Sequence, residues 1–169
     1  MTAPFPPPRG RISLVGAGPG AADLLTLRAL RCLQEADLIL YDRLVTEDIL
    51  ALIPAATRRI AVGKEVGANA WPQSRITALM LAEAVSGAHV VRLKSGDPTI
   101  FGRASEEIAG ARTLGLAVEI IPGITAASAA AASLCRSLTT RGVAQRLVIA
   151  TATDEADGAV PETLAPGTT

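Results

Sequence analysis

The sequence predicts an α/β fold: an open, mostly parallel five-stranded sheet with helices on both faces, followed by the start of a second α/β lobe. Short apolar runs, several of them rich in β-branched residues, alternate with segments whose apolar residues recur at helical spacing. Three of these runs end abruptly in turns of glycine and proline, at residues 16–20, 96–98 and 122–123. Apolar residues make up 49% of the 169 residues, which is enough for a sizeable core and excludes a disordered chain.

A glycine-rich turn separates the first expected strand from the first expected helix. Residues 12–15 form an apolar strand, which the run 16–20 ends. Thr26 is the expected N-cap of the helix, because its hydroxyl can accept a hydrogen bond from a free N–H of the first turn. Three apolar residues are expected along one face of this helix, namely Leu27, Leu30 and Leu33.

The next two strands each end at a polar residue. Residues 38–41 form the second strand, closed by Asp42, and residues 59–62 form the third, closed by Gly63 and Lys64. A short helical segment at 47–52 connects them.

The middle of the chain continues the alternation with a helix at 74–85, a strand at 89–93, a helix at 105–114 and a strand at 117–121. The fourth strand ends at Gly96, which can adopt backbone angles closed to other residues, and Pro98 then restricts Asp97 to extended conformations. Ligands of parallel α/β sheets bind at the carboxyl ends of the strands, so this turn and its neighbours predict a ligand site.

A third turn, at Pro122 and Gly123, closes the fifth strand. Thr125 is then expected to cap an Ala-rich helix that runs to about residue 134, and a further strand at 146–151 is expected to open a second lobe. The predicted organisation is a Pro-rich leader at 1–10, an N-terminal cofactor and substrate lobe at 11–138, and a linker with the truncated start of a C-terminal lobe at 139–169.

Composition argues against several classes of protein. Sixteen Lys and Arg residues balance sixteen Asp and Glu residues, which gives no support to nucleic-acid binding through a broad basic face. The longest apolar stretch, at 123–135, is mostly Ala and Ser and is too short for a membrane span. Cys32 and Cys135 have no metal-binding or redox spacing, so no metal is expected, and the cytoplasm is the expected compartment.

The first turn fits two kinds of ligand. Gly16-x-Gly18-x-x-Ala21 matches the dinucleotide fingerprint, with Asp42 placed as the ribose-binding carboxylate of an NAD(P)-dependent oxidoreductase. Pro19 argues against that ligand, because it removes an N–H where a pyrophosphate needs donors. A compact ligand without phosphate, such as adenosylmethionine, suits backbone groups presented by several loops.

Six motifs, in order, carry a resemblance to a known family: VGAGPG with LLTLRAL, LYDRLV, VGK, VRLKSGDPTIFGR and PGITAA. Over roughly residues 12–158 the chain resembles the uroporphyrinogen-III C-methyltransferases of the tetrapyrrole methylase family. The resemblance implies two α/β lobes, adenosylmethionine (the methyl donor) in the cleft between them, and a homodimer. It also implies transfer of two methyl groups to carbons 2 and 7 of uroporphyrinogen III, which gives precorrin-2 for sirohaem and cobalamin synthesis.

The resemblance also implies roles for individual residues. Asp42 would act as a proton acceptor and Lys64 as a proton donor. Cofactor contacts would come from Pro19, Ser95, Gly96, Asp97, Ile100, Thr125 and Ala126. The chemistry suits these residue types, because the pyrrole carbon attacks the methyl group in line and the methylated ring must then lose or redistribute protons.

The substrate carries eight carboxylates, which local positive charge could bind despite the neutral total. The candidates are Arg43, Lys64, Arg92, Lys94, Arg103 and Arg141. Two aromatic residues near the strand ends, Tyr41 and Phe101, are expected in the core rather than at the substrate.

The chain departs from the family pattern at several positions. Ser95 stands where the pattern has glycine, and its side chain is expected to crowd the cofactor. The second lobe has barely begun at residue 169, so the chain alone is expected to bind adenosylmethionine weakly and to methylate poorly or not at all. Besides the oxidoreductase, the remaining alternative is a degenerate, non-catalytic binding or dimerisation module.

Overall fold

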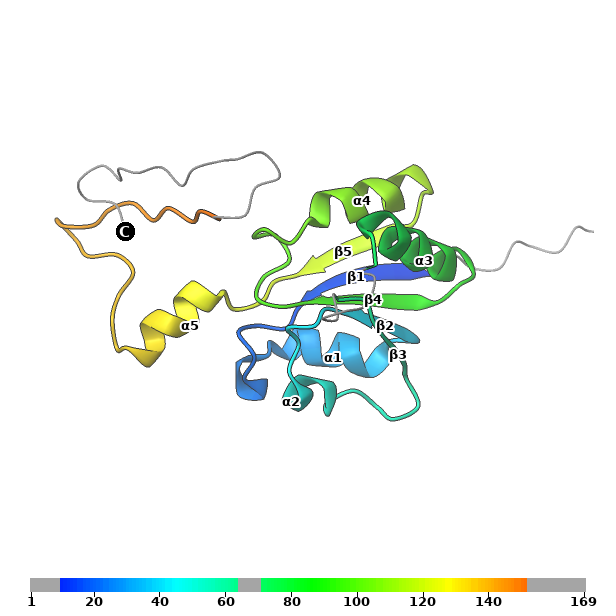
Figure 1. Cartoon of the computed structure of the whole chain (residues 1–169), viewed down its shortest axis with the longest axis horizontal. Coiled ribbons are helices and arrows are strands. Elements are labelled where there is room, and N and C mark those ends of the chain that lie inside the picture. Colours follow the sequence, from blue (N-terminus) through cyan, green and yellow to red (C-terminus); the bar gives the residue numbers. More distant parts are fainter. Residues whose placement is uncertain (1–9, 64–70, 152–169) are drawn as a thin grey trace, which may run out of the picture. The chain divides into compact units, whose positions relative to one another are not determined.

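A five-stranded sheet lies at the centre of the first part of the chain (Figure 1). The computed structural model describes residues 10–63 and 71–151. All four pairs of neighbouring strands are parallel, and the strand order is β3-β2-β4-β1-β5. The strands are β1 (Arg11–Gly16), β2 (Leu38–Tyr41), β3 (Arg58–Ala61), β4 (His89–Lys94) and β5 (Ala117–Ile121). The predicted open parallel sheet is therefore confirmed.

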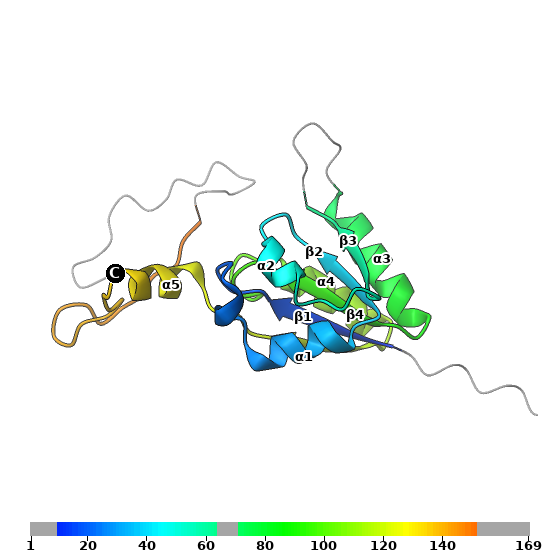
Figure 2. The same ribbon diagram turned by 90° about the horizontal axis from the view of Figure 1, so that it is seen from below.

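Helices cover both faces of this sheet, as expected. Helices α1 (Leu27–Glu35) and α2 (Glu47–Leu50) lie on one face, and α3 (Gln73–Val85) and α4 (Ala104–Thr113) lie side by side on the other (Figures 1 and 2). A short 3-10 helix, η1 (Ala22–Leu24), precedes α1. Each face has its own apolar cluster, so the sheet is the middle layer of three.

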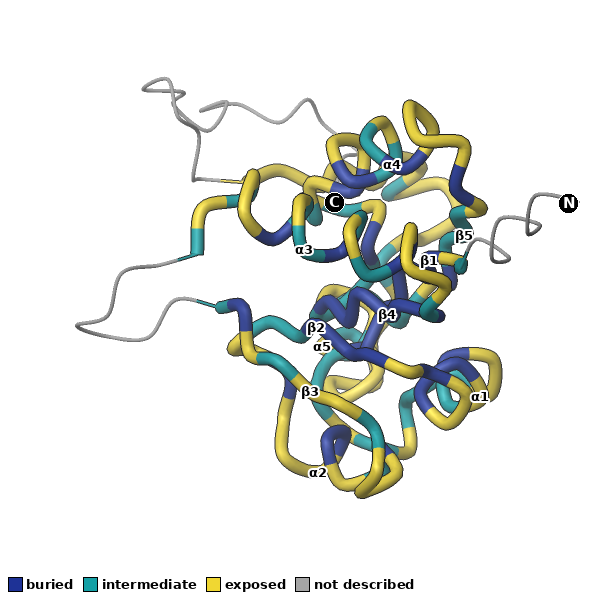
Figure 3. Tube along the Cα trace, turned by 90° about the vertical axis from the view of Figure 1, so that its right-hand side faces the viewer, coloured by how far each residue is buried: buried dark blue, intermediate teal, exposed yellow. Residues whose placement is uncertain are grey.

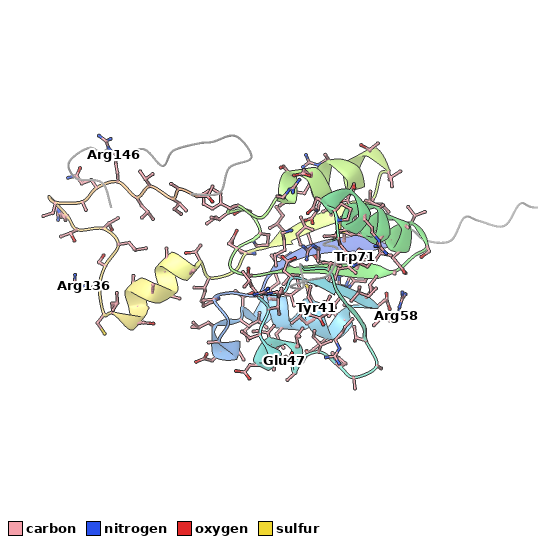
Figure 4. All side chains as sticks on the ribbon, in the orientation of Figure 1. Tyr41, Glu47, Arg58, Trp71, Arg136 and Arg146 are labelled. Carbon is pink, nitrogen blue, oxygen red and sulfur yellow. The ribbon has the colours of Figure 1, made fainter. Side chains whose placement is uncertain are left out.

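The three middle strands of the sheet are buried on both faces. Figure 3 shows β1, β2 and β4 in dark blue between helices whose outer turns are exposed. Strand β3 lies at an edge and is mostly exposed, and there Arg58 pairs with Glu83 of α3 at 3.0 Å (Arg58 is labelled in Figure 4). Long apolar runs fit the buried strands, because parallel sheets are covered on both faces.

The N-cap of α1 is confirmed, and of the three leucines expected along one face, Leu33 is buried and Leu30 is partly buried, whereas Leu27 faces solvent. The hydroxyl of Thr26 accepts a hydrogen bond from the N–H of Ala29 at 3.1 Å. The buried residues are Ala29, Cys32 and Leu33, whereas Leu27 is 74% exposed. A helix turns about 100° per residue, so Leu27 and Ala29 lie on nearly opposite sides and cannot both face the sheet.

The chain divides into two units, residues 1–125 and 126–169, and each is described by itself. The second unit holds α5 (Ala126–Ser133), which has no buried residue. The predicted strand at 146–151 does not form, and Leu147, Val148 and Ile149 are 45–47% exposed. A strand needs a partner to bond its backbone, and no named strand pairs with this segment in the described part of the chain.

Two expectations about organisation stay predictions. The expected boundary between the lobes at residue 138 is not tested, and the expected leader falls almost wholly outside the described residues.

The exposed residues Arg136 and Arg146 belong to the second unit and are labelled in Figure 4. None of the helices in the described residues is both long enough and apolar enough to cross a membrane.

Candidate functional site

Three glycines from separate strand ends pack against one another at the carboxyl edge of the sheet. Because β1 lies between β4 and β5, Gly16 at the end of β1 meets the turns that follow the other two strands. A Cβ on Gly16 would lie 2.6 Å from the Cα of Gly123 and 2.6 Å from the carbonyl oxygen of Gly96. A Cβ on Gly123 would lie 2.1 Å from that same oxygen. Side chains are excluded here, so the three turns form one backbone-lined junction.

A pair of backbone hydrogen bonds closes this junction. The N–H of Gly96 donates to the carbonyl of Gly18 at 2.8 Å, and the N–H of Gly18 donates back at 3.2 Å. Both residues have positive φ, +73° for Gly18 and +64° for Gly96, which favours glycine at each. A Cβ on Gly96 would meet nothing within 4 Å, so this turn faces open space.

The carboxylate of Asp97 ties two of the turns together. Its Oδ2 accepts from the N–H of Gly123 at 3.0 Å, and its Oδ1 accepts from the N–H of Thr99 at 2.8 Å and from the Thr99 hydroxyl. Burial favours a higher pKa for Asp97, but the bonds from Thr99 and Gly123 outweigh it and lower the pKa. The side chain of Asp97 is thus engaged within the protein.

The expected cofactor residues fall in the loops at this edge, with one exception. Pro19 follows β1, and Thr125 follows β5. The loop after β4 holds four more residues: Ser95, Gly96, Asp97 and Ile100. Ala126 is the first residue of the second unit, and its role stays a prediction.

A cavity of about 410 Å³ opens beside the turn that follows β4. It collects the end of β2, the end of β4, the start of α3 and the loop that leads into α4. Its lining residues are Asp42, Gln73, Arg92, Lys94, Ser95, Ile100, Phe101, Gly102 and Arg103. The cavity therefore joins Asp42 to two of the expected cofactor residues, Ser95 and Ile100.

Three charged residues of this lining and the fully buried Glu107 form a cluster, called here the buried ion cluster: Asp42, Arg92, Lys94 and Glu107. The guanidinium of Arg92 donates from Nη2 to Oδ1 of Asp42 and from Nε to Oε1 of Glu107 at 3.2 Å. The ammonium of Lys94 binds both carboxylate oxygens of Glu107, at 3.2 and 3.1 Å. Only Asp42 reaches solvent to any extent, at 31% side-chain exposure against 5% or less for the other three.

The position of Arg92 and Lys94 corrects an expectation from the sequence. Both were candidates to bind substrate carboxylates, but their side chains are 3% and 5% exposed and their charges are paired with Glu107. Burial lowers the pKa of Lys94, as does the neighbouring charge of Arg92, while Glu107 and Asp42 act in the opposite direction. Arg92 and Lys94 therefore have a structural role in the wall of the cavity, where they pair with Glu107.

Sequence reasoning missed Glu107 and Gln73. Glu107 lies in the first turn of α4 and is fully buried, and Gln73 at the start of α3 donates to its Oε1 at 2.9 Å. One clue was available: Arg92 and Lys94 alternate with apolar residues in a strand expected to be buried, so both cations share a face and require a buried anion.

The loop between β4 and α4 holds two non-glycine residues in the left-handed region. Phe101 has φ +50° and Arg103 has φ +53°, and both line the cavity. Phe101 is 59% exposed, so its expected place in the core is wrong. Between them, a Cβ on Gly102 would lie 2.3 Å from the carbonyl oxygen of Pro98. Such backbone conformations cost energy and cluster at functional sites.

The two expected proton-transfer residues have different outcomes. Asp42 lies at the cavity, with its Oδ1 bound by Arg92. Lys64 lies outside the described residues, so its role stays a prediction.

An open parallel sheet with side-chain-free turns at the strand-order switch defines the class: a doubly wound α/β protein. Proteins of this class bind their ligands at the carboxyl edge of the sheet. The chain belongs to the tetrapyrrole (corrin/porphyrin) methylases, because the model of that family matches residues 11–169.

Individual relatives agree with this assignment. A uroporphyrinogen-III C-methyltransferase of Paracoccus denitrificans is 52% identical over 138 residues, which are 82% of this chain and 48% of the relative. A sirohaem synthase of Tolumonas auensis is 46% identical over 153 residues, covering 90% of this chain and 33% of the relative.

A solved structure of the same class matches the fold. The uroporphyrin-III C-methyltransferase of Thermus thermophilus, complexed with S-adenyl homocysteine, superposes with a TM-score of 0.67 and 45% identity. The match covers 82% of this chain and 58% of that one. The chain thus spans about half the length, or less, of the curated relatives described above.

Proposed function

We propose that this protein is an adenosylmethionine-dependent methyltransferase of carbons 2 and 7 of uroporphyrinogen III, which yields precorrin-2, and that the 169-residue chain alone binds the donor weakly and transfers methyl groups slowly. Membership of the methylase family supports the reaction class, and the names of the relatives support the substrate. The observation that carries the proposal is the junction of Gly16, Gly96 and Gly123. Side chains are excluded there, so only backbone atoms are presented at the carboxyl edge of the sheet.

The junction fits adenosylmethionine better than a dinucleotide. The open space beside Gly96 leaves room for a ligand to approach the backbone, and Pro19 offers no N–H to a phosphate. Asp42 is bound to Arg92 and lines the cavity on the side of α3 and α4, so a ribose is not its evident partner. These contacts disfavour the nicotinamide-dependent alternative.

When bound, adenosylmethionine supplies an electrophilic methyl group on sulfur. The residues of the chain then have two tasks. The turns after β1, β4 and β5 hold the donor, and the Asp42 carboxylate accepts the proton that the ring gives up after each new C–C bond has formed. Lys64 is proposed to return a proton to the ring system. The proposal also includes a homodimer in the cytoplasm and no metal.

Ligand protection and methyl transfer test the proposal together. Adenosylhomocysteine should raise the unfolding temperature of the purified chain, because a ligand at 100 times its Kd stabilises the folded state by roughly 2.7 kcal/mol. NAD at the same concentration should not. Transfer of labelled methyl groups to uroporphyrinogen III is measured in the same preparation. The molecular mass of the protein in solution, measured by light scattering, shows whether it is a dimer. Protection by NAD alone would support the oxidoreductase, and a dimer without ligand protection or transfer would support the non-catalytic module.

A further inference from the structure

The side chain of Arg92 is held by four hydrogen bonds on three sides. Besides its bonds to Asp42 and Glu107, its Nη1 donates to the carbonyl of Leu40 at 3.3 Å and to the carbonyl of Leu93 at 3.2 Å. A guanidinium is planar and carries its donors in a fixed fork, so these contacts leave the group a single orientation. Arg92 is therefore a rigid support under Asp42.

Glu107 holds the guanidinium of Arg92 in place. Its Oε1 accepts from Arg92, Lys94 and Gln73, and its Oε2 accepts from Lys94. The formal charges of Asp42, Glu107, Arg92 and Lys94 sum to zero, and no buried side-chain N or O atom of the described residues lacks a hydrogen-bond partner. The three buried members of the cluster, Arg92, Lys94 and Glu107, thus leave no buried polar atom without a partner.

Stability alone is a weak reason for such a cluster. Buried ion pairs often contribute no more than apolar residues of the same volume, because removing charges from water costs several kcal/mol per ion. A position on the face of the sheet that α3 and α4 cover, beside a cavity, calls for another explanation.

Asp42 provides that explanation, because its two carboxylate oxygens differ. Arg92 binds Oδ1, while Oδ2 has no hydrogen-bond partner among the residues that the structure describes. Asp42 is also the partly exposed member of the cluster and lines the cavity. One oxygen is anchored and the other is available to a ligand.

We propose that Arg92 and Glu107 are positioning residues: Glu107 fixes Arg92, and Arg92 fixes the Asp42 carboxylate with one oxygen available to take a proton from the substrate. This inference rests on the proposed function. Its physical basis is that proton transfer requires the acceptor within hydrogen-bond reach of the proton, so a carboxylate free to rotate spends less time in the productive orientation.

The first test measures the position of Asp42 and needs no activity. Three-bond couplings to the Asp42 carboxyl carbon report its side-chain rotamer by NMR in the full 169-residue chain. We expect a single rotamer in the unsubstituted protein and averaged couplings in Arg92→Met and in Glu107→Gln. Arg58→Met is the matched control, because Arg58 is an exposed arginine paired with Glu83 at the sheet edge, and it should leave the couplings unchanged. A single rotamer retained in both cluster variants would overturn the proposal.

The second test asks whether Arg92 acts through Asp42. In single-turnover methyl transfer we expect Arg92→Met to slow the reaction by about 10- to 100-fold, part of the ~10²–10⁴ that a general base contributes, with KM for both substrates within about twofold. Arg92→Lys, which keeps the charge, should restore part of the rate. In the Asp42→Asn background the same Arg92→Met change should cost nothing further, whereas a merely structural role predicts additive losses. Additive losses would overturn the proposal.

Each result has a separate meaning. No methyl transfer by the unsubstituted chain would contradict the proposed function for this chain, and the coupling measurement would still decide the positioning role. Should Arg92→Met fail to fold, the isosteric Glu107→Gln and the charge-retaining Arg92→Lys carry the same comparison, with thermal unfolding as the check on folding.

Discussion

Gly123 should be the least replaceable glycine of the ligand edge. The substitution Gly123→Ala adds a carbon 2.1 Å from the carbonyl oxygen of Gly96 and 2.9 Å from the Cα of Gly16. Both neighbours are backbone atoms, so no rotamer change can relieve the overlap. The turns must move apart by about 1 Å, since an overpacked site relaxes only by shifting its backbone.

The energetic cost follows from what that movement breaks. Overpacking costs roughly 1–3 kcal/mol, and the movement also weakens the Asp97–Gly123 bond and the Gly18–Gly96 pair, each bond being worth about 1 kcal/mol. We expect the free energy of unfolding to fall by about 2–4 kcal/mol. At about 4 °C per kcal/mol for a domain of this size, the unfolding temperature should drop by roughly 8–16 °C.

Thermal unfolding measured by circular dichroism, with Gly96→Ala as the comparison, checks this reasoning. Gly96 has room for a Cβ but a φ of +64°, so its substitution should cost only the ~1–2 kcal/mol of a left-handed non-glycine residue. A Gly123→Ala variant as stable as Gly96→Ala would refute the close-packed junction.

Three further predictions concern the site and the pH dependence. Ser95→Gly should tighten adenosylhomocysteine binding by about 2- to 10-fold if the serine side chain crowds the ligand, and calorimetry showing equal or weaker binding would contradict this. Asp42→Asn should lower turnover by ~10²–10⁴ while adenosylmethionine affinity stays within about twofold, and loss of affinity with unchanged turnover would instead indicate a ribose-binding role. Burial and, secondarily, the charge of Arg11 lower the pKa of His89 below its ordinary value of 6.5, so the unfolded chain binds more protons than the folded one just below that pH. Stability should therefore fall as the pH drops from about 7.5 to about 5.5, as measured by unfolding temperature, and a flat or rising profile would count against a buried neutral imidazole.

The sheet, its helices and the glycine turns could be predicted because their causes are local. Apolar periodicity and Gly–Pro turns depend on residues that are neighbours in sequence. The predicted bounds are therefore identical to the observed ones for β2 and β5, and differ by at most one residue at either end for the other strands. Thr26 as the N-cap of α1 belongs to the same class, because a cap bonds within its own first turn.

What could not be predicted depends on contacts between distant segments. The buried face of α1 depends on how the helix meets the sheet, so Leu27 was misplaced. Arg92 and Lys94 were assigned to the substrate because their anion, Glu107, reaches them only when α4 packs on the sheet. The segment 146–151 has the composition of a strand, but composition supplies no partner for its backbone.

The position of β1 in the sheet also determines when the domain can fold during synthesis. β1 is made before the other four strands, yet among the described strands its two neighbours are β4 and β5, with contacts such as Arg11 to His89 and Ser13 to Glu119, which are 78 and 106 residues apart in sequence. At ~5–20 residues per second, translation leaves this apolar strand unpaired for roughly 5–20 seconds. Nascent chains that end before residue 117 lack one neighbour of β1, and we expect them to remain sensitive to protease and to engage chaperones. Release of the fifth strand from the ribosome is then the event that commits the chain to its native topology.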